Sequence, residues 1–195
     1  MIKSLLLCLL CPFVFATTNE NEEPTFFYVY SDKGAQINHY VPSGWMGDYG
    51  DLKIDDRNTE SPKSGKTAIK WTYNAKKAQG ANWAGCYWQN PANNWGDKDG
   101  GFNLTGYKRL KFWAKGAKGG ERIDTFKVGG ITGPHADSDT ESIGPITLTQ
   151  EWKEYTINLA NLDLQSIIGG FAWAASGDDN PDGFVIFLDE IRFEK

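Results

Sequence analysis

Short strand-like segments separated by turn residues run through this chain, and they restrict its fold class more than any other feature. The clearest is Lys108–Lys115, where Leu110, Phe112 and Ala114 alternate with polar or outward-facing side chains. Clusters of Gly, Pro, Asn and Asp separate the segments, and no convincing amphipathic helix is present. The predicted strands are Thr25–Tyr30, Lys66–Tyr73, Trp83–Gln89, Lys108–Lys115, Glu121–Val128, Ile143–Leu148, Glu151–Leu159, Ile167–Ala175 and Phe184–Phe193. We therefore predict an all-β fold, a two-sheet antiparallel β-sandwich of the jelly-roll type.

The N-terminal residues 1–16 have the features of a secretory signal peptide. Lys3 precedes an apolar run that ends at Ala16, and the run is too short to span a membrane. A lipid anchor is the alternative, because Cys8 and Cys11 lie in this run, although each follows Leu where such signals need a small residue. Residues 17–24 are polar and acidic and are predicted to be a disordered leader. Residues 25–195 then form one domain of a secreted protein, extracellular or periplasmic.

Charge and cysteine content restrict the partners and the means of stabilisation. The formal net charge of −5 argues against nucleic acid and anionic membranes as partners. Cys86 is the one cysteine that follows residue 16, so the domain is expected to have no internal disulfide. It must be held by its core or by a metal. Cys86 itself is expected to point inward as a small apolar filler.

The segment Trp83–Gly96, WAGCYWQNPANNWG, holds three of the eight tryptophans together with several side-chain amides. A flat aromatic ring can cover the C–H face of a sugar while amides bond its hydroxyl groups. The alternative is that these rings fill the core, since highly buried tryptophans are common. Strand alternation places Trp83, Tyr87 and Gln89 on one face and Trp88 on the other.

From this pattern we predict a non-catalytic protein that binds a polysaccharide or oligosaccharide. We expect the first face to be concave and shared with Trp113 and Trp173, with Trp95 at the rim of the adjoining loop. Trp113 is chosen because it lies on the polar face of its strand. The predicted sugar-binding residues are Trp83, Tyr87, Gln89, Asn93, Asn94, Trp95, Trp113 and Trp173.

Two other functions remain open. A glycoside hydrolase or lyase needs two carboxylates about 5–10 Å apart. Residues 31–56, predicted to be a long irregular loop, carry two acids beside Trp45 and Tyr49. The candidate acids are Asp48, Asp51, Glu121, Asp137, Asp139 and Glu141, and His135 could assist them. An adhesin that recognises protein would instead expose an apolar patch.

Three segments resemble those of the galactose-binding-like jelly-roll superfamily. They are GKTAIKW after SPKSG, GGFNLTGYKRLKFWAKG, and the closing GFVIFLDEIRFEK. That superfamily includes many carbohydrate-binding modules of secreted polysaccharide-degrading enzymes. The resemblance implies a structural calcium ion bound by the carboxylates of Asp32 and Asp189 and the carbonyl of Lys66, an oxygen-only set suited to Ca²⁺. The family often has two aspartates where this chain has Asp189 and Glu190, so the part played by Glu190 stays open.

Overall fold

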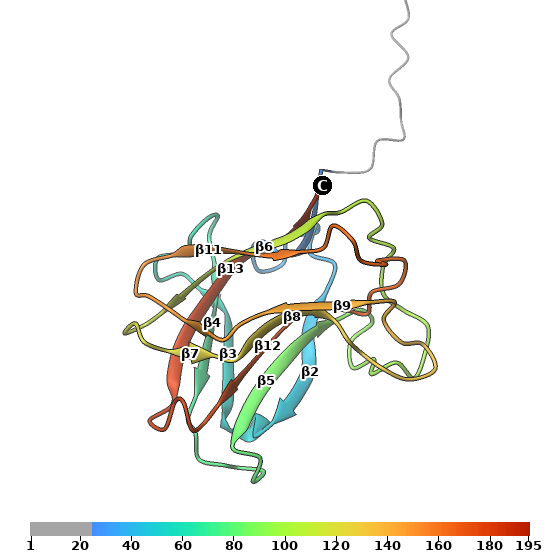
Figure 1. Cartoon of the computed structure of the whole chain (residues 1–195). Coiled ribbons are helices and arrows are strands. Elements are labelled where there is room, and N and C mark those ends of the chain that lie inside the picture. The colour runs from blue at the N-terminus through green and yellow to red at the C-terminus, as the bar shows by residue number, and fades with distance from the viewer. Residues whose placement is uncertain (1–24) are drawn as a thin grey trace, which may run out of the picture.

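The computed structural model describes residues 25–195, which form two facing antiparallel sheets (Figure 1). Sheet A has the order β11-β6-β13-β4-β3, with β1 also paired to β13, and sheet B has the order β2-β5-β12-β8-β9. Sheet A comprises β1 (Phe26–Tyr30), β3 (Leu52–Asn58), β4 (Ala68–Tyr73), β6 (Arg109–Gly116), β11 (Lys153–Asn158) and β13 (Phe184–Glu194). Sheet B comprises β2 (Val41–Gly47), β5 (Trp83–Gln89), β8 (Thr125–Gly129), β9 (Thr140–Ile143) and β12 (Gly169–Ser176). The predicted all-β sandwich is confirmed.

Shorter elements complete the described part of the chain. The strands β7 (Arg122–Ile123) and β10 (Ile146–Thr147) pair as a two-stranded ribbon, and a 3-10 turn, η1, covers Tyr49–Asp51. The predicted signal peptide, residues 1–16, and the predicted leader, residues 17–24, lie outside the described residues.

An aromatic core joins the two sheets. Trp71 of sheet A meets Trp88 and Trp173 of sheet B edge-on, with ring centroids 5.8 and 5.3 Å apart. All three rings are fully buried, and each buried aromatic side chain contributes about 1.5–3 kcal/mol to stability. Cys86 is buried beside them, and burial raises the pKa of its thiol, in line with the predicted role of an inert apolar filler. A core of this kind can hold the sandwich without a disulfide.

The structure corrects the prediction for residues 31–56. This segment is not one long loop, because it contains β2 and most of β3. Pro42, Gly44 and Gly47 are not typical of a strand, so the sequence did not predict β2, which is an edge strand of sheet B. An edge strand tolerates proline, and the pairing with β5 shifts between Pro42 and Gly44. Two predicted strands are also divided, residues 121–128 into β7 and β8, and residues 143–148 between β9 and β10.

Candidate functional site

The outer face of sheet B carries most of the predicted sugar-binding residues. Along β5 the side chains alternate as expected: Cys86 and Trp88 belong to the core between the sheets, while Tyr87 belongs to a separate apolar cluster on the outer face. Trp83 lies on the same outer face and is 39% exposed, whereas Gln89 is fully buried. We call this surface the sheet-B face.

The end of β2 positions Trp83. The backbone N–H of Asp48 donates to the Trp83 carbonyl at 2.7 Å. Gly47 has a φ of +60°, and a Cβ atom placed on it would lie 2.2 Å from the Trp83 carbonyl oxygen and 3.0 Å from Cδ2 of the indole. Only glycine adopts this conformation readily and leaves this space. The position of the Trp83 ring therefore depends on the absence of a side chain at residue 47.

A second exposed ring lies in the loop that follows β5. Trp95, 40% exposed, meets Tyr87 edge-on with ring centroids 5.8 Å apart. Tyr87 is itself nearly buried, and its hydroxyl donates to the Gly129 carbonyl at 3.1 Å. The residues packed around Tyr87 are Ile131, Ile168, Ala172 and Met46. Tyr87 thus supports the floor of the sheet-B face, and Trp95 presents the accessible ring above it.

The predicted amide ligands are used mostly inside the protein. Gln89 Nε2 donates to the Asn94 carbonyl at 2.9 Å, and Gln89 Oε1 accepts from Ser43 Oγ at 2.8 Å. Asn94 Nδ2 donates to the Lys98 carbonyl at 2.8 Å, and the side chain is only 1% exposed. These bonds fix the loop that carries Trp95. Of the three predicted amides, only Asn93 is exposed.

Two predicted anchors do not lie on this face, and here the expectation is wrong. Trp173 pairs with Cys86 across β12 and β5, so it shares the inward direction of Cys86 and is fully buried. Trp113 belongs to β6 and lies on the outer face of sheet A, on the other side of the molecule. Its ring is covered by Lys63, whose Nζ lies 3.9 Å from the ring centroid.

Two further exposed aromatic rings lie beside β5, outside the predicted set. Tyr49 of η1 is 52% exposed and directly follows Asp48, whose backbone N–H bonds the Trp83 carbonyl. Trp45 is 36% exposed at the sandwich edge and contacts the buried Trp71 edge-on at 5.4 Å. The signal was present in the sequence SGWMGDYG, where aromatic residues stand among glycines.

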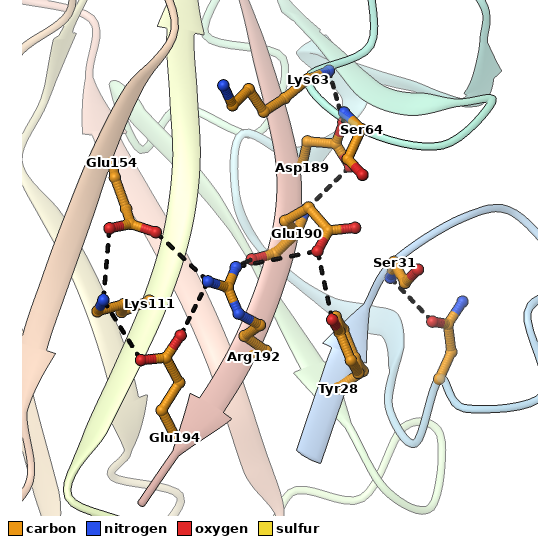
Figure 2. Close-up of polar contacts among 11 residues, drawn as sticks. Tyr28, Ser31, Lys63, Ser64, Lys111, Glu154, Asp189, Glu190, Arg192 and Glu194 are labelled. Atoms are coloured by element: carbon orange, nitrogen blue, oxygen red, sulfur yellow. Dashed lines mark hydrogen bonds and ion pairs between the residues drawn. The ribbon is translucent and has the colours of Figure 1, made fainter. Parts of the chain in front are cut away.

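The predicted calcium ligands gather at one loop. Asp32 Oδ1 accepts the backbone N–H groups of Lys66 and Thr67 at 2.8 and 2.7 Å. Asp189 Oδ2 accepts those of Lys63 and Ser64 at 2.8 and 3.2 Å, as Figure 2 shows in part. Within residues 25–195, no group of three or more Asp, Glu, His or Cys side chains is arranged to hold a metal. A metal here would need backbone carbonyls beside the carboxylates, as the resemblance implies for Lys66.

Asp189 is an unusual member of this group. It is fully buried, and within the described residues no Lys or Arg nitrogen lies within ion-pair distance of its carboxylate. Burial raises the pKa of Asp189 to about 7, against the opposing effect of its backbone hydrogen bonds. A buried carboxylate of this kind needs either a proton or a cation at neutral pH.

The two acids that flank Tyr49 and Gly50 hold the loop of residues 74–82. Asp48 is fully buried and accepts the backbone N–H groups of Gln79, Ala81 and Asn82 at 2.8, 2.9 and 2.6 Å. Burial opposes ionisation, but these N–H groups outweigh it and lower the pKa of Asp48. Asp51 accepts the N–H groups of Lys76 and Ala78. A lowered pKa is the opposite of what a general acid needs.

The remaining candidate acids are also tied to loops. Asp137 accepts the backbone N–H groups of Ile131, Ile168 and Gly169, and burial raises its pKa. Asp139 accepts the Asp163 N–H, and Glu121 accepts the Lys118 N–H at 2.8 Å. Glu141 is exposed and bonds the Ser142 N–H, while His135 pairs with Asp99. Asp137 therefore has the raised pKa that a general acid needs, but its carboxylate is held by three backbone N–H groups, and these contacts join it to no second carboxylate.

Within residues 25–195, no helical segment has the length and apolar character of a membrane span.

Comparison with known proteins shows which solved structures share this fold. No protein-family model and no curated protein sequence matches the chain. A crystal structure of a family 30 carbohydrate-binding module matches with a TM-score of 0.60 and 15% identity, over 87% of this chain and 98% of that chain. The family 30 module of the cellulosomal cellulase Cel9D-Cel44B of Clostridium thermocellum matches with a TM-score of 0.56 and 16% identity, over 87% and 97%.

A third structure belongs to another family. It is the family 11 carbohydrate-binding module from Clostridium thermocellum in complex with a β-1,3-1,4-mixed-linked tetrasaccharide. The TM-score is 0.52 and the identity 14%, over 84% of this chain and 92% of that chain. At these identities the likeness establishes the fold. The protein is a jelly-roll β-sandwich of the kind found in several families of carbohydrate-binding modules, as the sequence resemblance implies.

Proposed function

We propose that the protein is a non-catalytic carbohydrate-binding protein that holds a polysaccharide or oligosaccharide on the sheet-B face. The observation that carries this proposal is the pair of exposed indole rings, Trp83 and Trp95, on one face of a sandwich with the fold of carbohydrate-binding modules. Neither ring is capped by a lysine or arginine of the described residues, in contrast to Trp113. Both can therefore meet the C–H face of a sugar.

The spacing of the rings favours a chain over a single sugar. Trp83 and Tyr87 are four residues apart on β5, a rise of about 13 Å, and Trp95 lies against Tyr87. Because this rise exceeds the length of one pyranose ring, we expect the two indoles to engage successive units of a chain. Each ring would contribute about 1–3 kcal/mol, which gives micromolar to millimolar affinity after the cost of association.

A fluorescence titration tests the proposal. Purified protein is titrated with soluble glucans, xylans and mannans, beginning with a mixed-linkage β-glucan. We expect saturable quenching with one polymer class, about tenfold weaker in Trp83→Ala and in Trp95→Ala. Trp113→Ala is the matched control, because it removes a ring from the opposite face. Equal loss of affinity in all three variants, or no binding to any polymer, would contradict the proposal.

The same samples separate binding from cleavage. A binding protein releases no new reducing ends from the polymer during prolonged incubation. Release that disappears on substitution of Asp137 or another loop acid would show a hydrolase or lyase instead.

We also propose that Ca²⁺ binds at the Asp32 and Asp189 carboxylates, with backbone oxygens such as that of Lys66 completing the set. Support comes from the buried, uncompensated charge of Asp189 and from the proximity of Asp32 to the same loop. A bound ion would stabilise the native state alone, so EDTA should lower the melting temperature and CaCl₂ restore it. If EDTA changes the melting temperature of neither the native protein nor Asp32→Asn, the site is refuted.

Secretion is the last part of the proposed function, supported by the signal-like residues 1–16. When the full chain is expressed in a host with a general secretion pathway, we expect an exported product that begins at Thr17. Intracellular retention of a chain that still carries residues 1–16 would refute this.

A further inference from the structure

The outer face of sheet A carries lysine ammonium groups over aromatic rings. Phe187 of β13 lies in register with Lys70 of β4 on one side and Lys115 of β6 on the other. The Nζ atoms of Lys70 and Lys115 lie 5.8 and 5.1 Å from the Phe187 ring centroid. Lys115 Nζ is also 5.1 Å from the Trp152 ring. Such contacts hold a lysine in place while leaving N–H groups free to face solvent.

A third lysine is held over the same face by the loop before β4. Lys63 Nζ lies 3.9 Å from the Trp113 ring centroid, and Trp152 Nε1 donates to the Ser61 carbonyl at 3.0 Å. Lys63 contacts Asp189 only through its backbone N–H, and Figure 2 shows the Lys63 side chain extending away from Asp189. We call Lys63, Lys70 and Lys115 the lysine patch.

The lysine patch is neutralised only at Lys70, unlike the cations beside it. Further along β6 and β13, Lys111 and Arg192 share the carboxylates of Glu154 and Glu194 at 2.8–3.5 Å (Figure 2). Within the patch, Lys70 pairs with the largely exposed Glu60 at 3.9 Å, and Asp55 of β3 lies in register with Lys70 on the same face. Among the ion pairs of residues 25–195, none involves Lys63 or Lys115. These two lysines therefore carry the unbalanced positive charge of the patch.

We propose that the lysine patch is a second binding surface, for a polysaccharide whose sugars carry carboxylates. Lys70 and Lys115 stand in one row with a single strand between them, so their backbones are about 10 Å apart. Repeated carboxylates along a uronate chain can meet Lys63 and Lys115, which form no ion pair with any described residue, and Lys70 adds a third contact. Neutral sugars have less to gain, because lysines already cover these ring faces. The net charge of −5 repels a polyanion elsewhere, so binding must be local.

Affinity electrophoresis or calorimetry with polygalacturonate at low salt tests this proposal. The double variant Lys63→Gln with Lys115→Gln should bind about fivefold more weakly, as expected for two surface ion pairs. The matched control is Lys76→Gln with Lys108→Gln, which removes the same charge from exposed positions outside the patch. We expect the control to bind as the unmodified protein does, and melting curves verify that both variants are folded.

Three results would overturn the inference. They are no binding of polygalacturonate, equal weakening in the patch and control variants, or loss of binding in Trp83→Ala with the patch variant unaffected. The surface is independent of the sheet-B face, so binding of neutral polymers should be unchanged in the patch variant. Failure of the neutral titration would refute the proposed function and leave this inference standing.

Discussion

At the scale of single residues, Asp189 makes the stability of the protein depend on pH. Its pKa is raised from 3.8 to about 7, first by burial. As pH rises from about 4 to about 7, the unfolded state loses its proton while the folded state retains one, so stability falls across this window and then levels off. In EDTA we expect the native protein to lose a few kcal/mol over this range and Asp189→Asn to lose much less.

Melting temperatures measured at intervals from pH 4 to pH 8 check this prediction. Parallel curves for the native protein and Asp189→Asn would contradict it. If the proposed calcium ion binds, CaCl₂ should restore stability mainly at the upper end of the range, where Asp189 is ionised.

Two tryptophans that look alike in the sequence should respond differently to truncation. Trp173 is fully buried against Trp71, so Trp173→Ala should cost about 3–5 kcal/mol of unfolding free energy. Trp83 is 39% exposed, so Trp83→Ala should cost much less stability while weakening glycan binding. Urea unfolding of the two variants measures the difference. A larger loss in Trp83→Ala would contradict the assignment of one ring to the core and the other to the surface.

At the scale of elements, the turn after β2 controls how β5 presents its first ring. Gly47→Ala would bring a Cβ atom onto the Trp83 carbonyl, where Gly47 now leaves room. We expect weaker glycan binding with the fold retained, measured by titration and circular dichroism. Gly34→Ala is the matched control, because Gly34 also has a positive φ, +77°, but nothing lies within 4 Å of its Cβ position. Equal effects of both variants would contradict a specific role in positioning Trp83.

The strands also show which parts of the site can be predicted from the sequence. Alternation in β5 and β6 is explicit in the sequence, and the faces of Trp83, Tyr87 and Trp88 follow from it. Alternation does not say to which sheet a strand belongs, so Trp113 could not be separated from the sheet-B face. The inward direction of Trp173 depends on its pairing with Cys86, which is a long-range contact. The strand β2 was missed because edge position, which permits Pro42, is a property of the assembled sheet.

At the scale of the whole molecule, the sandwich presents two outer faces of different chemistry. The sheet-B face exposes uncapped indoles over an apolar floor, whereas sheet A exposes rings covered by lysines beside a network of ion pairs. The fold class could be predicted because strands and turns are local signals. Buried amides such as Gln89 and Asn94 could not be told from sugar ligands, since their partners are set by loop packing.

The proposed function requires that Trp83 and Trp95 contact a bound glycan on the sheet-B face. Each indole N–H gives its own signal in a two-dimensional NMR spectrum of the ¹⁵N-labelled protein, and single substitutions assign the signals. On addition of a glycan that binds, we expect the Trp83 and Trp95 signals to shift with saturation while those of Trp113 and Trp152 stay in place. Shifts at Trp113 and Trp152, with Trp83 and Trp95 unmoved, would contradict it.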